Sequence, residues 1–348
     1  MQLNTYTLTY TNLSNSMHVD AQQPLVLQDY LRRRGWLDTD EAISSVEKPG
    51  EGNMNYTLRV ATPNRTLIVK QSRGYVEKYP TIAAPADRAI IEGQFYQKTQ
   101  AIPTLAGQMP QLLGIDAENN ILVLEDLGAA SDFTFLYQPG QQLSEADALA
   151  LTTYLSDLHD QFTTQTPDSA FANRAMRALN HEHIVNYPFL ENNGFDLDTI
   201  QPGLQELAMR YKRNAGLKKT VQTLGEVYLA NGRTDKPITL LHGDYYPGSW
   251  LQTASGTKII DPEFCFYGPA EFDLGVMIAH MMMAEQPPVV LSTVLTSYQP
   301  IEGFDELLRQ RFTGVEIMRR LIGLAQLPLS LSLNAKRTLL DEAYSLLS

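Results

Sequence analysis

Cysteine is almost absent from this 348-residue chain, in which Cys265 stands alone. A disulfide within the chain is therefore excluded, which fits a reducing compartment, and we expect a cytoplasmic protein. Long apolar runs are also missing, since the most apolar stretch, Leu274–Ala284, is too short to span a bilayer. The N-terminus MQLNTYTLTY has no basic segment followed by an apolar one, so we expect neither a signal peptide nor a membrane partner.

Positive charge is scarce as well. The chain has 27 Lys and Arg against 39 Asp and Glu, and its net charge is −12. Binding to a nucleic-acid backbone needs clustered Lys and Arg, so this balance argues against a nucleic-acid partner. With 43% hydrophobic and 19% charged residues, the composition is that of an ordinary globular protein, long enough for two domains or lobes.

What the chain does have is two apolar runs that each end at acidic residues. Ile238–Leu241 leads to Asp244, and Lys258–Ile260 leads to Asp261 and Glu263. Between the two runs we expect a turn at Pro247–Ser249, a short strand at Trp250-Leu251 and a hairpin turn at Ser255-Gly256. This hairpin would bring all three carboxylates to one end of a sheet. Crowded like charges need a cation, and Mg²⁺ takes one or two carboxylates together with water and phosphate oxygens.

Phosphoryl transfer uses such an arrangement. Asp244 would orient the attacking hydroxyl as a base, while Asp261 and Glu263 would hold the metal. Acidic residues are also common in turns, so one such triplet alone would more often belong to a loop without catalytic function. Two of them in order, with Asp244 and Asp261 seventeen residues apart and each following an apolar strand, favour catalysis.

Two segments of Leu240–Gly275, HGDYYPGS and IIDPEFCFYGPAEFDLG, resemble the aminoglycoside and choline phosphotransferase superfamily, most closely its 5-methylthioribose kinases. The resemblance implies an α+β, two-lobed protein-kinase-like fold with a small antiparallel-sheet N-lobe and a larger, mainly helical C-lobe. It also implies ATP and Mg²⁺ as cofactors, a small-molecule hydroxyl acceptor and a homodimer. Ser249 stands where the wider superfamily has an asparagine metal ligand, so Glu263 should carry more of the metal ligation.

The expected lobes are residues 25–127 and 128–348, which follow an N-terminal arm, 1–24, that the sequence leaves undefined. The N-lobe has the pattern of an antiparallel meander. The three expected strands of the meander are Ile43–Val46, Tyr56–Ala61 and Thr66–Lys70. A hairpin of Leu112–Ile115 and Ile121–Leu124 is expected later in this lobe. The main expected helices are Leu25–Trp36, Ala86–Gln100, a segment beginning after Ser144, and Leu204–Asn231.

A nucleotide site is predicted on the N-lobe. Gly50, Gly52 and Asn53 lie between the first two strands, where glycines bring backbone amides close to a ligand. Alone this is an ordinary hairpin turn, but a strand ending in Lys70 follows, as in kinases. Glu92, on the next helix, resembles the glutamate that fixes this lysine. The alternatives are an exposed strand-end lysine and a solvated helix glutamate.

The N-lobe ends in LVLEDLG, which resembles the linker between the two lobes of the family. Backbone groups of Glu125 and Leu127, rather than their side chains, are expected to meet adenine. Further on, Asp273 in EFDLG resembles the aspartate that holds the catalytic loop by hydrogen bonds. Residues 181–203 show no clean periodicity and are either a wall of the acceptor pocket or a plain surface loop.

Two arginines near the C-terminus are the candidate acceptor ligands. GVEIMRRLIGLAQ is close to the methylthioribose kinase pattern in which paired arginines reach the sugar, so Arg319 and Arg320 would bind substrate, or else be surface charges. The chain departs from that pattern at Tyr245–Pro247 and after Gly323. Both departures fall where a substrate would be selected.

The sequence thus predicts an enzyme that transfers the γ-phosphoryl group of ATP to a small-molecule hydroxyl, with 5-methylthioribose as the best candidate. One alternative is a kinase for another acceptor, such as choline, ethanolamine, an aminoglycoside or a different sugar. The other is a nucleotide-binding pseudokinase without turnover.

Overall fold

The first lobe is built on a five-stranded antiparallel sheet. The computed structural model describes residues 17–50, 54–230 and 236–348, and the strand order of the sheet is β1-β2-β3-β7-β6. Its strands are β1 (Ser45–Glu47), β2 (Tyr56–Ala61), β3 (Thr66–Gln71), β6 (Leu112–Asp116) and β7 (Ile121–Glu125). The predicted meander is therefore confirmed, with shifts of a residue or two at the strand ends.

Alternate side chains of the sheet enter two different cores. Ile121 and Val123 pack with helix α1 (Pro24–Arg33), whereas Leu122 and Leu124 pack with helix α2 (Arg88–Thr99). This two-residue period is what a strand covered on both faces requires. Helix α2 therefore lies between the sheet and the second lobe, where its side chains reach both.

The chain crosses to the second lobe directly after β7. The next strand, β8 (Ala130–Asp132), already pairs with β10 of the second lobe. Three more short elements of the first lobe were not predicted from the sequence: β4 (Tyr75–Val76), β5 (Tyr79–Ala83) and the helical turn α3 (Pro103–Ala106).

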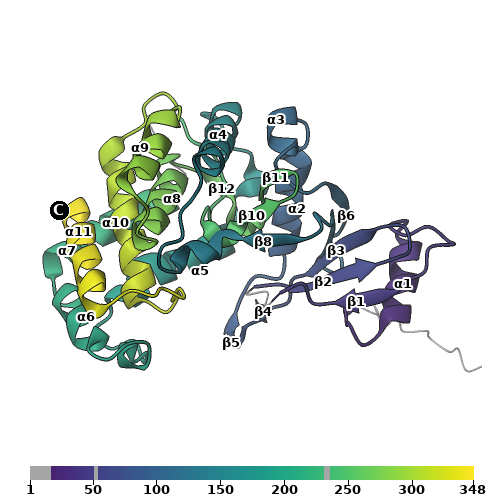
Figure 1. The fold of residues 1–348 in the computed structure, drawn as a ribbon, viewed down its shortest axis with the longest axis horizontal. Coiled ribbons are helices and arrows are strands. Elements are labelled where there is room, and N and C mark those ends of the chain that lie inside the picture. The colour runs from purple at the N-terminus through teal and green to yellow at the C-terminus, as the bar shows by residue number, and fades with distance from the viewer. Residues whose placement is uncertain (1–16, 51–53, 231–235) are drawn as a thin grey trace, which may run out of the picture.

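The second lobe is mainly helical (Figure 1). Its helices are α4 (Glu145–Gln161), α5 (Arg174–His181), α6 (Leu204–Lys212), α7 (Ala215–Leu229), α8 (Glu271–Met283), α9 (Pro288–Ser297), α10 (Glu306–Ile322) and α11 (Leu333–Leu347). Helix α8 is buried on nearly every side, as its apolar sequence requires, and α10 packs between α8 and α11. Among the described residues, no helix is both long and apolar enough to cross a membrane.

Two expectations for this lobe need correction. The single helix predicted over Leu204–Asn231 is wrong, because the chain breaks between α6 and α7. Asn214 begins the second helix: its side chain accepts the N–H of Leu217 at 3.0 Å, which is an N-cap. Residues 181–203 contain short helical turns, a π-type turn over Glu182–Asn186 and 3₁₀ turns over Tyr187–Phe189 and Leu197–Thr199.

Four short strands and several helical turns carry the acidic loops. The strands are β9 (Thr239–Leu241), β10 (Trp250–Thr253), β11 (Gly256–Ile259) and β12 (Phe266–Gly268), and the turns used below are η1 (Phe133–Tyr137), η6 (Pro247–Ser249) and η7 (Pro262–Phe264).

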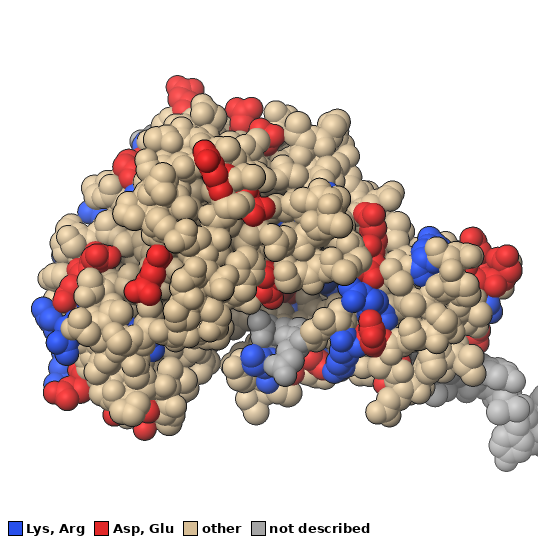
Figure 2. Space-filling model, in the orientation of Figure 1, with Lys and Arg blue, Asp and Glu red and all other residues tan. Residues whose placement is uncertain are grey.

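On the face drawn in Figure 2, the coloured basic side chains form no continuous surface over the helical lobe. An anionic ligand approaching that face would meet individually placed cations.

Candidate active site

The loop after β9 presents Asp244 and is held by Asp273 of α8. The Asp273 carboxylate accepts the N–H groups of His242 at 2.7 Å and Gly243 at 3.0 Å, so the contact predicted for this aspartate is confirmed. Gly243 has φ +84°, and a Cβ there would lie 2.2 Å from the carbonyl oxygen of Phe264. Only glycine fits this turn.

His242 joins the two acidic loops. The ring is buried, and burial lowers its pKa, so the imidazole is neutral. Nε2 lies 2.9 Å from the carbonyl of Ile260 and must donate to it, which leaves Nδ1 to accept the N–H of Asp244 at 3.4 Å. Because Ile260 directly precedes Asp261, one side chain fixes the spacing between the two loops.

The hairpin predicted between the two acidic loops is confirmed as the β10–β11 pair, but the strand that leads to Asp244 does not belong to it. Strand β9 pairs with β12, with Leu241 opposite Phe266, while the β10–β11 hairpin pairs with β8. The turn η6 separates β9 from β10 and sends the chain into the other sheet. The acidic loops still converge, since Asp244 and Asp261 both act electrostatically on the phenol of Tyr246.

Lys70 lies where the two lobes meet. Its Nζ is 2.7 Å from Glu92 Oε1 and also contacts the carboxylate of Asp261. Burial opposes the charge of Lys70, but Asp261 and then Glu92 outweigh it and raise its pKa well above the usual value. Lys70 and Glu92 are both buried, so the exposed alternatives for this pair are wrong.

The side chains of the two predicted metal ligands differ in their exposure to solvent. Asp261 sits in the left-handed region at φ +63°, where aspartate is among the tolerated residues, and its side chain is 43% exposed. Glu263 is buried. Its Oε2 accepts from Asn55 Nδ2 at 3.0 Å and lies 3.4 Å from Arg88 Nε. Burial, opposed by Arg88, raises the pKa of Glu263 to about 8.

The donor chemistry of Asp261 and Glu263 fits Mg²⁺. The described residues contain no group of three or more acidic, histidine or cysteine side chains that could hold an ion. Mg²⁺ does not need such a cage, because it keeps waters and takes substrate phosphates beside one or two carboxylates. Asp261 is open to an ion, whereas Glu263 would first have to turn away from Arg88 and Asn55. The Ser249 hydroxyl donates instead to the carbonyl of Asp244 at 2.8 Å.

Arg88 of α2 is fully buried, although an arginine on a helix is more often exposed at the surface. Its guanidinium donates to four backbone carbonyls from three segments of the N-lobe, those of Met54, Arg73, Tyr75 and Pro85. Arg88 thus links the edge of the glycine-rich turn to Glu263. Its position four residues before Glu92, on the same face of α2, is the one sequence signal for this contact.

Arg319 and Arg320 both approach Asp244. Their Nη2 atoms lie 3.6 Å and 3.5 Å from Asp244 Oδ1, and both side chains are buried, so the surface-charge alternative is wrong. Burial raises the pKa of Asp244, and the two arginines partly oppose the rise. Glu316 was not predicted as part of the site, although its spacing of three and four residues from the two arginines indicates such pairs. Its carboxylate oxygens lie within 2.8 Å of both arginine Nε atoms.

The remaining nucleotide-site predictions stay untested. Gly50 is exposed with open space around its Cα, while Gly52 and Asn53 lie outside the described residues, as does most of the 1–24 arm. In the linker, the N–H of Glu125 donates to the carbonyl of Gln111 at 2.9 Å, so this donor is already engaged in the sheet. Leu127 is half-buried beside it.

Comparison with known proteins places this geometry in a family. The phosphotransferase enzyme family model matches residues 45–308. Methylthioribose kinase of Exiguobacterium sibiricum is 28% identical over 282 residues, which cover 76% of this chain and 68% of that protein. Choline kinase LicA from Streptococcus pneumoniae has a similar structure, with a TM-score of 0.50 at 13% identity over 94% of this chain and 99% of that one.

A second solved structure, spectinomycin phosphotransferase APH(9)-Ia in complex with ADP and spectinomycin, gives a TM-score of 0.51 at 15% identity and covers 95% of this chain and 98% of that one. The fold is therefore that of the protein-kinase-like small-molecule phosphotransferases, as predicted from the sequence. The chain belongs to the phosphotransferase enzyme family.

Proposed function

We propose that this enzyme transfers the γ-phosphoryl group of ATP to a hydroxyl of a small, uncharged polyhydroxy acceptor, with 5-methylthioribose as the first candidate. The observation that carries the proposal is the position of Asp244 beside two buried arginines. Asp244 is 23% exposed, which leaves its carboxylate accessible to an incoming hydroxyl. Its raised pKa suits a group that accepts a proton.

The charges around Asp244 favour an uncharged acceptor. Arg319 and Arg320 bring two positive charges, while Glu316 and Asp244 bring two negative ones. The guanidinium groups can donate hydrogen bonds to sugar hydroxyls. A cationic acceptor such as choline or an aminoglycoside would meet both arginines beside the reacting carboxylate, which disfavours it. The relatives named methylthioribose kinase support the same choice.

On the nucleotide side, Lys70 would bind the α- and β-phosphates, and Glu92 would keep it directed at them. Bound Mg²⁺, on Asp261 and Glu263, would offset phosphate charge during transfer. Solved relatives in complex with ADP and AMP support a nucleotide in this cleft. The pseudokinase alternative is disfavoured, because Lys70, Asp244, Asp261 and Glu263 are all present.

A panel of acceptors tests the proposal. The purified protein, ATP and Mg²⁺ are incubated with 5-methylthioribose, ribose, choline, ethanolamine or an aminoglycoside, and products are identified by mass. We expect a phosphorylated product from 5-methylthioribose that Asp244→Asn does not form. Transfer to choline or to the aminoglycoside instead would contradict the acceptor class. ATP binding without transfer to any acceptor would support a pseudokinase.

Glu263→Gln tests the metal assignment. Glutamine keeps the acceptor oxygen for Asn55 but cannot ionise to hold a metal ion, so the fold should persist while Mg²⁺ binds more weakly. We expect the Mg²⁺ concentration for half-maximal rate to rise roughly tenfold or more, since even an outer partner of a metal site is worth about 10- to 100-fold in affinity. The rate is measured against Mg²⁺ at saturating ATP.

Glu77→Gln is the matched control, because Glu77 pairs with Arg73 in the same lobe and has no proposed metal role. An unchanged Mg²⁺ dependence in Glu263→Gln would mean that Glu263 only anchors Arg88 and Asn55.

A further inference from the structure

A buried histidine on α8 contacts the glutamate that pairs with Arg319 and Arg320. His280 is fully buried; its Nδ1 lies 2.6 Å from the hydroxyl of Tyr137 and its Nε2 lies 2.9 Å from Glu316 Oε1. The three residues come from η1, α8 and α10, so the contact joins elements far apart in the chain. None of the three was singled out by the sequence.

The direction of these hydrogen bonds follows from the charges. Burial lowers the pKa of His280 to about 4, so the ring is neutral near pH 7 and has one donor and one acceptor nitrogen. Burial alone would raise the pKa of Glu316, but Arg319 and Arg320 outweigh it and lower it, so Glu316 is an ionised acceptor. Nε2–H must therefore donate to Glu316, and Nδ1 accepts from the Tyr137 hydroxyl.

Glu316 in turn holds both arginines. Its Oε2 lies 2.6 Å from Arg319 Nε and its Oε1 lies 2.8 Å from Arg320 Nε. Arg320 Nε donates a hydrogen bond to Glu316, whereas Arg319 Nε makes an ion-pair contact without hydrogen-bond geometry, and the outer nitrogens of both arginines extend toward Asp244. Arg319 also donates to Asn180 Oδ1 at 2.9 Å. The guanidinium of Arg320 lies 4.9 Å from the ring centroid of Tyr246, one of the positions where the chain departs from its relatives.

A neutral hydrogen-bond donor suits the position next to Glu316. Glu316 and Asp244 already balance Arg319 and Arg320, so a third cation in the buried cluster would lack a partner and would be costly. A neutral imidazole fixes the carboxylate plane without adding charge. Without its hydrogen bond, Glu316 would be free to rotate toward one arginine and release the other.

A similar arrangement occurs at Asp273, the carboxylate that accepts from the backbone of the loop before Asp244. His159 has Nδ1 2.7 Å from the hydroxyl of Tyr298 and Nε2 3.5 Å from Asp273, the carboxylate that holds the catalytic loop. In both cases a histidine lies between a tyrosine hydroxyl and a carboxylate. That carboxylate fixes part of the surroundings of Asp244. One arrangement fixes the backbone of the loop, and the other fixes the arginines.

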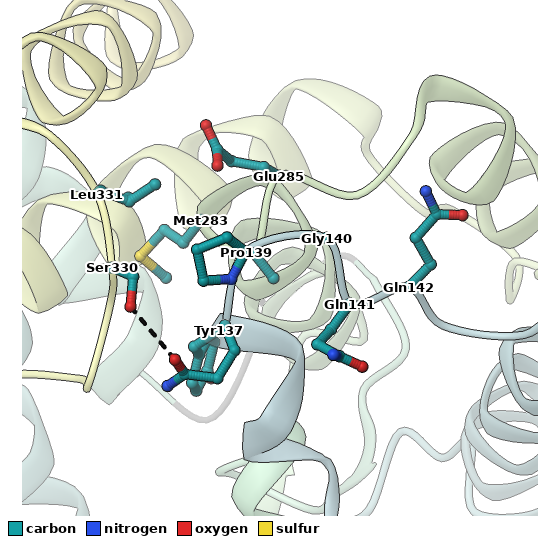
Figure 3. A pocket seen from close by; sticks show the side chains of 11 residues that line it. Tyr137, Pro139, Gly140, Gln141, Gln142, Met283, Glu285, Ser330 and Leu331 are labelled. Atoms are coloured by element: carbon teal, nitrogen blue, oxygen red, sulfur yellow. Dashed lines mark hydrogen bonds between the residues drawn. The ribbon is translucent and has the colours of Figure 1, made fainter.

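One small cavity lies near this cluster but does not belong to the site. A small pocket of about 50 Å³ lies beside Tyr137 and is walled by Gln138, Met283, Ser330 and Leu331 (Figure 3). Ser330 donates to Gln138 across it at 3.4 Å. None of the site carboxylates lines this pocket, so it is not where the reacting hydroxyl binds.

We propose that His280 is a positioning residue, which, with Tyr137 behind it, orients Arg319 and Arg320 through Glu316 for acceptor binding. The inference rests on the proposed function, because the arginines act on the acceptor. It assigns His280 no contact with substrate. Loss of its hydrogen bond should therefore weaken acceptor binding and leave nucleotide binding unchanged.

The test compares His280→Gln with His280→Met, two side chains of similar length and shape. Glutamine can donate to Glu316 from nearly the position of Nε2, and methionine cannot. We expect the acceptor KM to rise about 10- to 100-fold in His280→Met, as for a lost hydrogen bond to a charged group, and to stay within about threefold in His280→Gln. The ATP KM should stay unchanged in both. Equal acceptor KM values for the two variants, or an equal rise in the ATP KM, would overturn the proposal.

Tyr137→Phe decides the matter if His280→Met does not fold. It removes the hydroxyl that donates to His280 Nδ1. Tyr211→Phe is its control, since Tyr211 is equally buried and its hydroxyl donates to Asp341 at 2.8 Å, in a part of the protein outside the site. We expect a higher acceptor KM in Tyr137→Phe alone. Matching values in the two variants would refute the positioning role.

A spectroscopic measurement separates this inference from the proposed function. If the wild-type protein phosphorylates no acceptor, the proposed function fails, and the positioning role is read from hydrogen exchange at the Nε–H of Arg320, which donates to Glu316 at 2.8 Å. We expect exchange to be at least about tenfold faster in His280→Met than in the wild type, and close to wild type in His280→Gln. Equal exchange in all three proteins would show that His280 does not hold the arginines.

Discussion

Asp244→Asn is expected to lower kcat by about 10³-fold, within the range that a positioned general base contributes, while the affinity for ATP stays close to wild type. Asparagine keeps the size of the side chain and the N–H that Asp244 donates to His242. It removes only the group that accepts the proton of the attacking hydroxyl. Single-turnover rates and nucleotide binding, each measured on the same preparation, separate chemistry from binding.

The variant should fold, because Glu316 still holds both arginines when Asp244 loses its charge. Asp160→Asn, on the exposed side of α4, is the matched control and should keep the wild-type rate. The pH dependence of the wild-type rate gives a second test. Because burial raises the pKa of Asp244, activity should begin to fall, as pH decreases, at a higher pH than it would with an ordinary aspartate as the base. A kcat within about threefold of wild type in Asp244→Asn would contradict the role of base.

The positions of the residues proposed to carry the chemistry could be predicted because short sequence patterns specify them. Asp244, Asp261 and Asp273 each follow or begin an apolar element, and the structure brings them into one region as expected. Lys70 and Glu92 also meet as predicted, since a strand end and a helix face fix where each side chain points. Their roles toward nucleotide and metal stay predictions, as do the cytoplasmic location and the homodimer.

The pairing of the short strands could not be predicted. A three-residue strand such as β9 has no register signal of its own, so its partner is decided by the rest of the fold. The β10–β11 hairpin was predictable from its turn residues, whereas the pairing of β9 with β12 and of β10 with β8 was not. The break at Asn214 is different, because an asparagine followed by a helical pattern is an N-cap signal that was available in the sequence.

Buried charge was the other source of error. Arg88 looks like an ordinary helix-surface residue, and nothing local shows that four backbone carbonyls from distant segments surround it. His280 lies in an apolar helix and acquires its partners only when η1 and α10 pack against α8. Contacts of this kind depend on tertiary structure, so a single sequence does not reveal them.

Lys70→Met is expected to reduce kcat/KM for ATP by roughly 10- to 100-fold, because it removes a charged hydrogen-bond donor to the phosphates. It should also destabilise the protein, since Glu92 is fully buried and would lose its cation. Breaking a buried ion pair on one side costs about 3–5 kcal/mol. The single variant therefore mixes two effects, and a fall in activity alone would not show that Lys70 binds nucleotide.

The double variant Lys70→Met/Glu92→Gln separates them. Neutralising Glu92 removes the unpaired buried charge, so the free energy of unfolding should return most of the way to wild type, as measured by denaturant unfolding. The ATP kinetics should stay as poor as in Lys70→Met. Lys98→Met is the matched control, because Lys98 forms a partly exposed pair with Asp168 at 3.1 Å and should change stability by less than about 1 kcal/mol. Recovery of ATP kinetics in the double variant would show that Lys70 serves the fold and does not bind the phosphates.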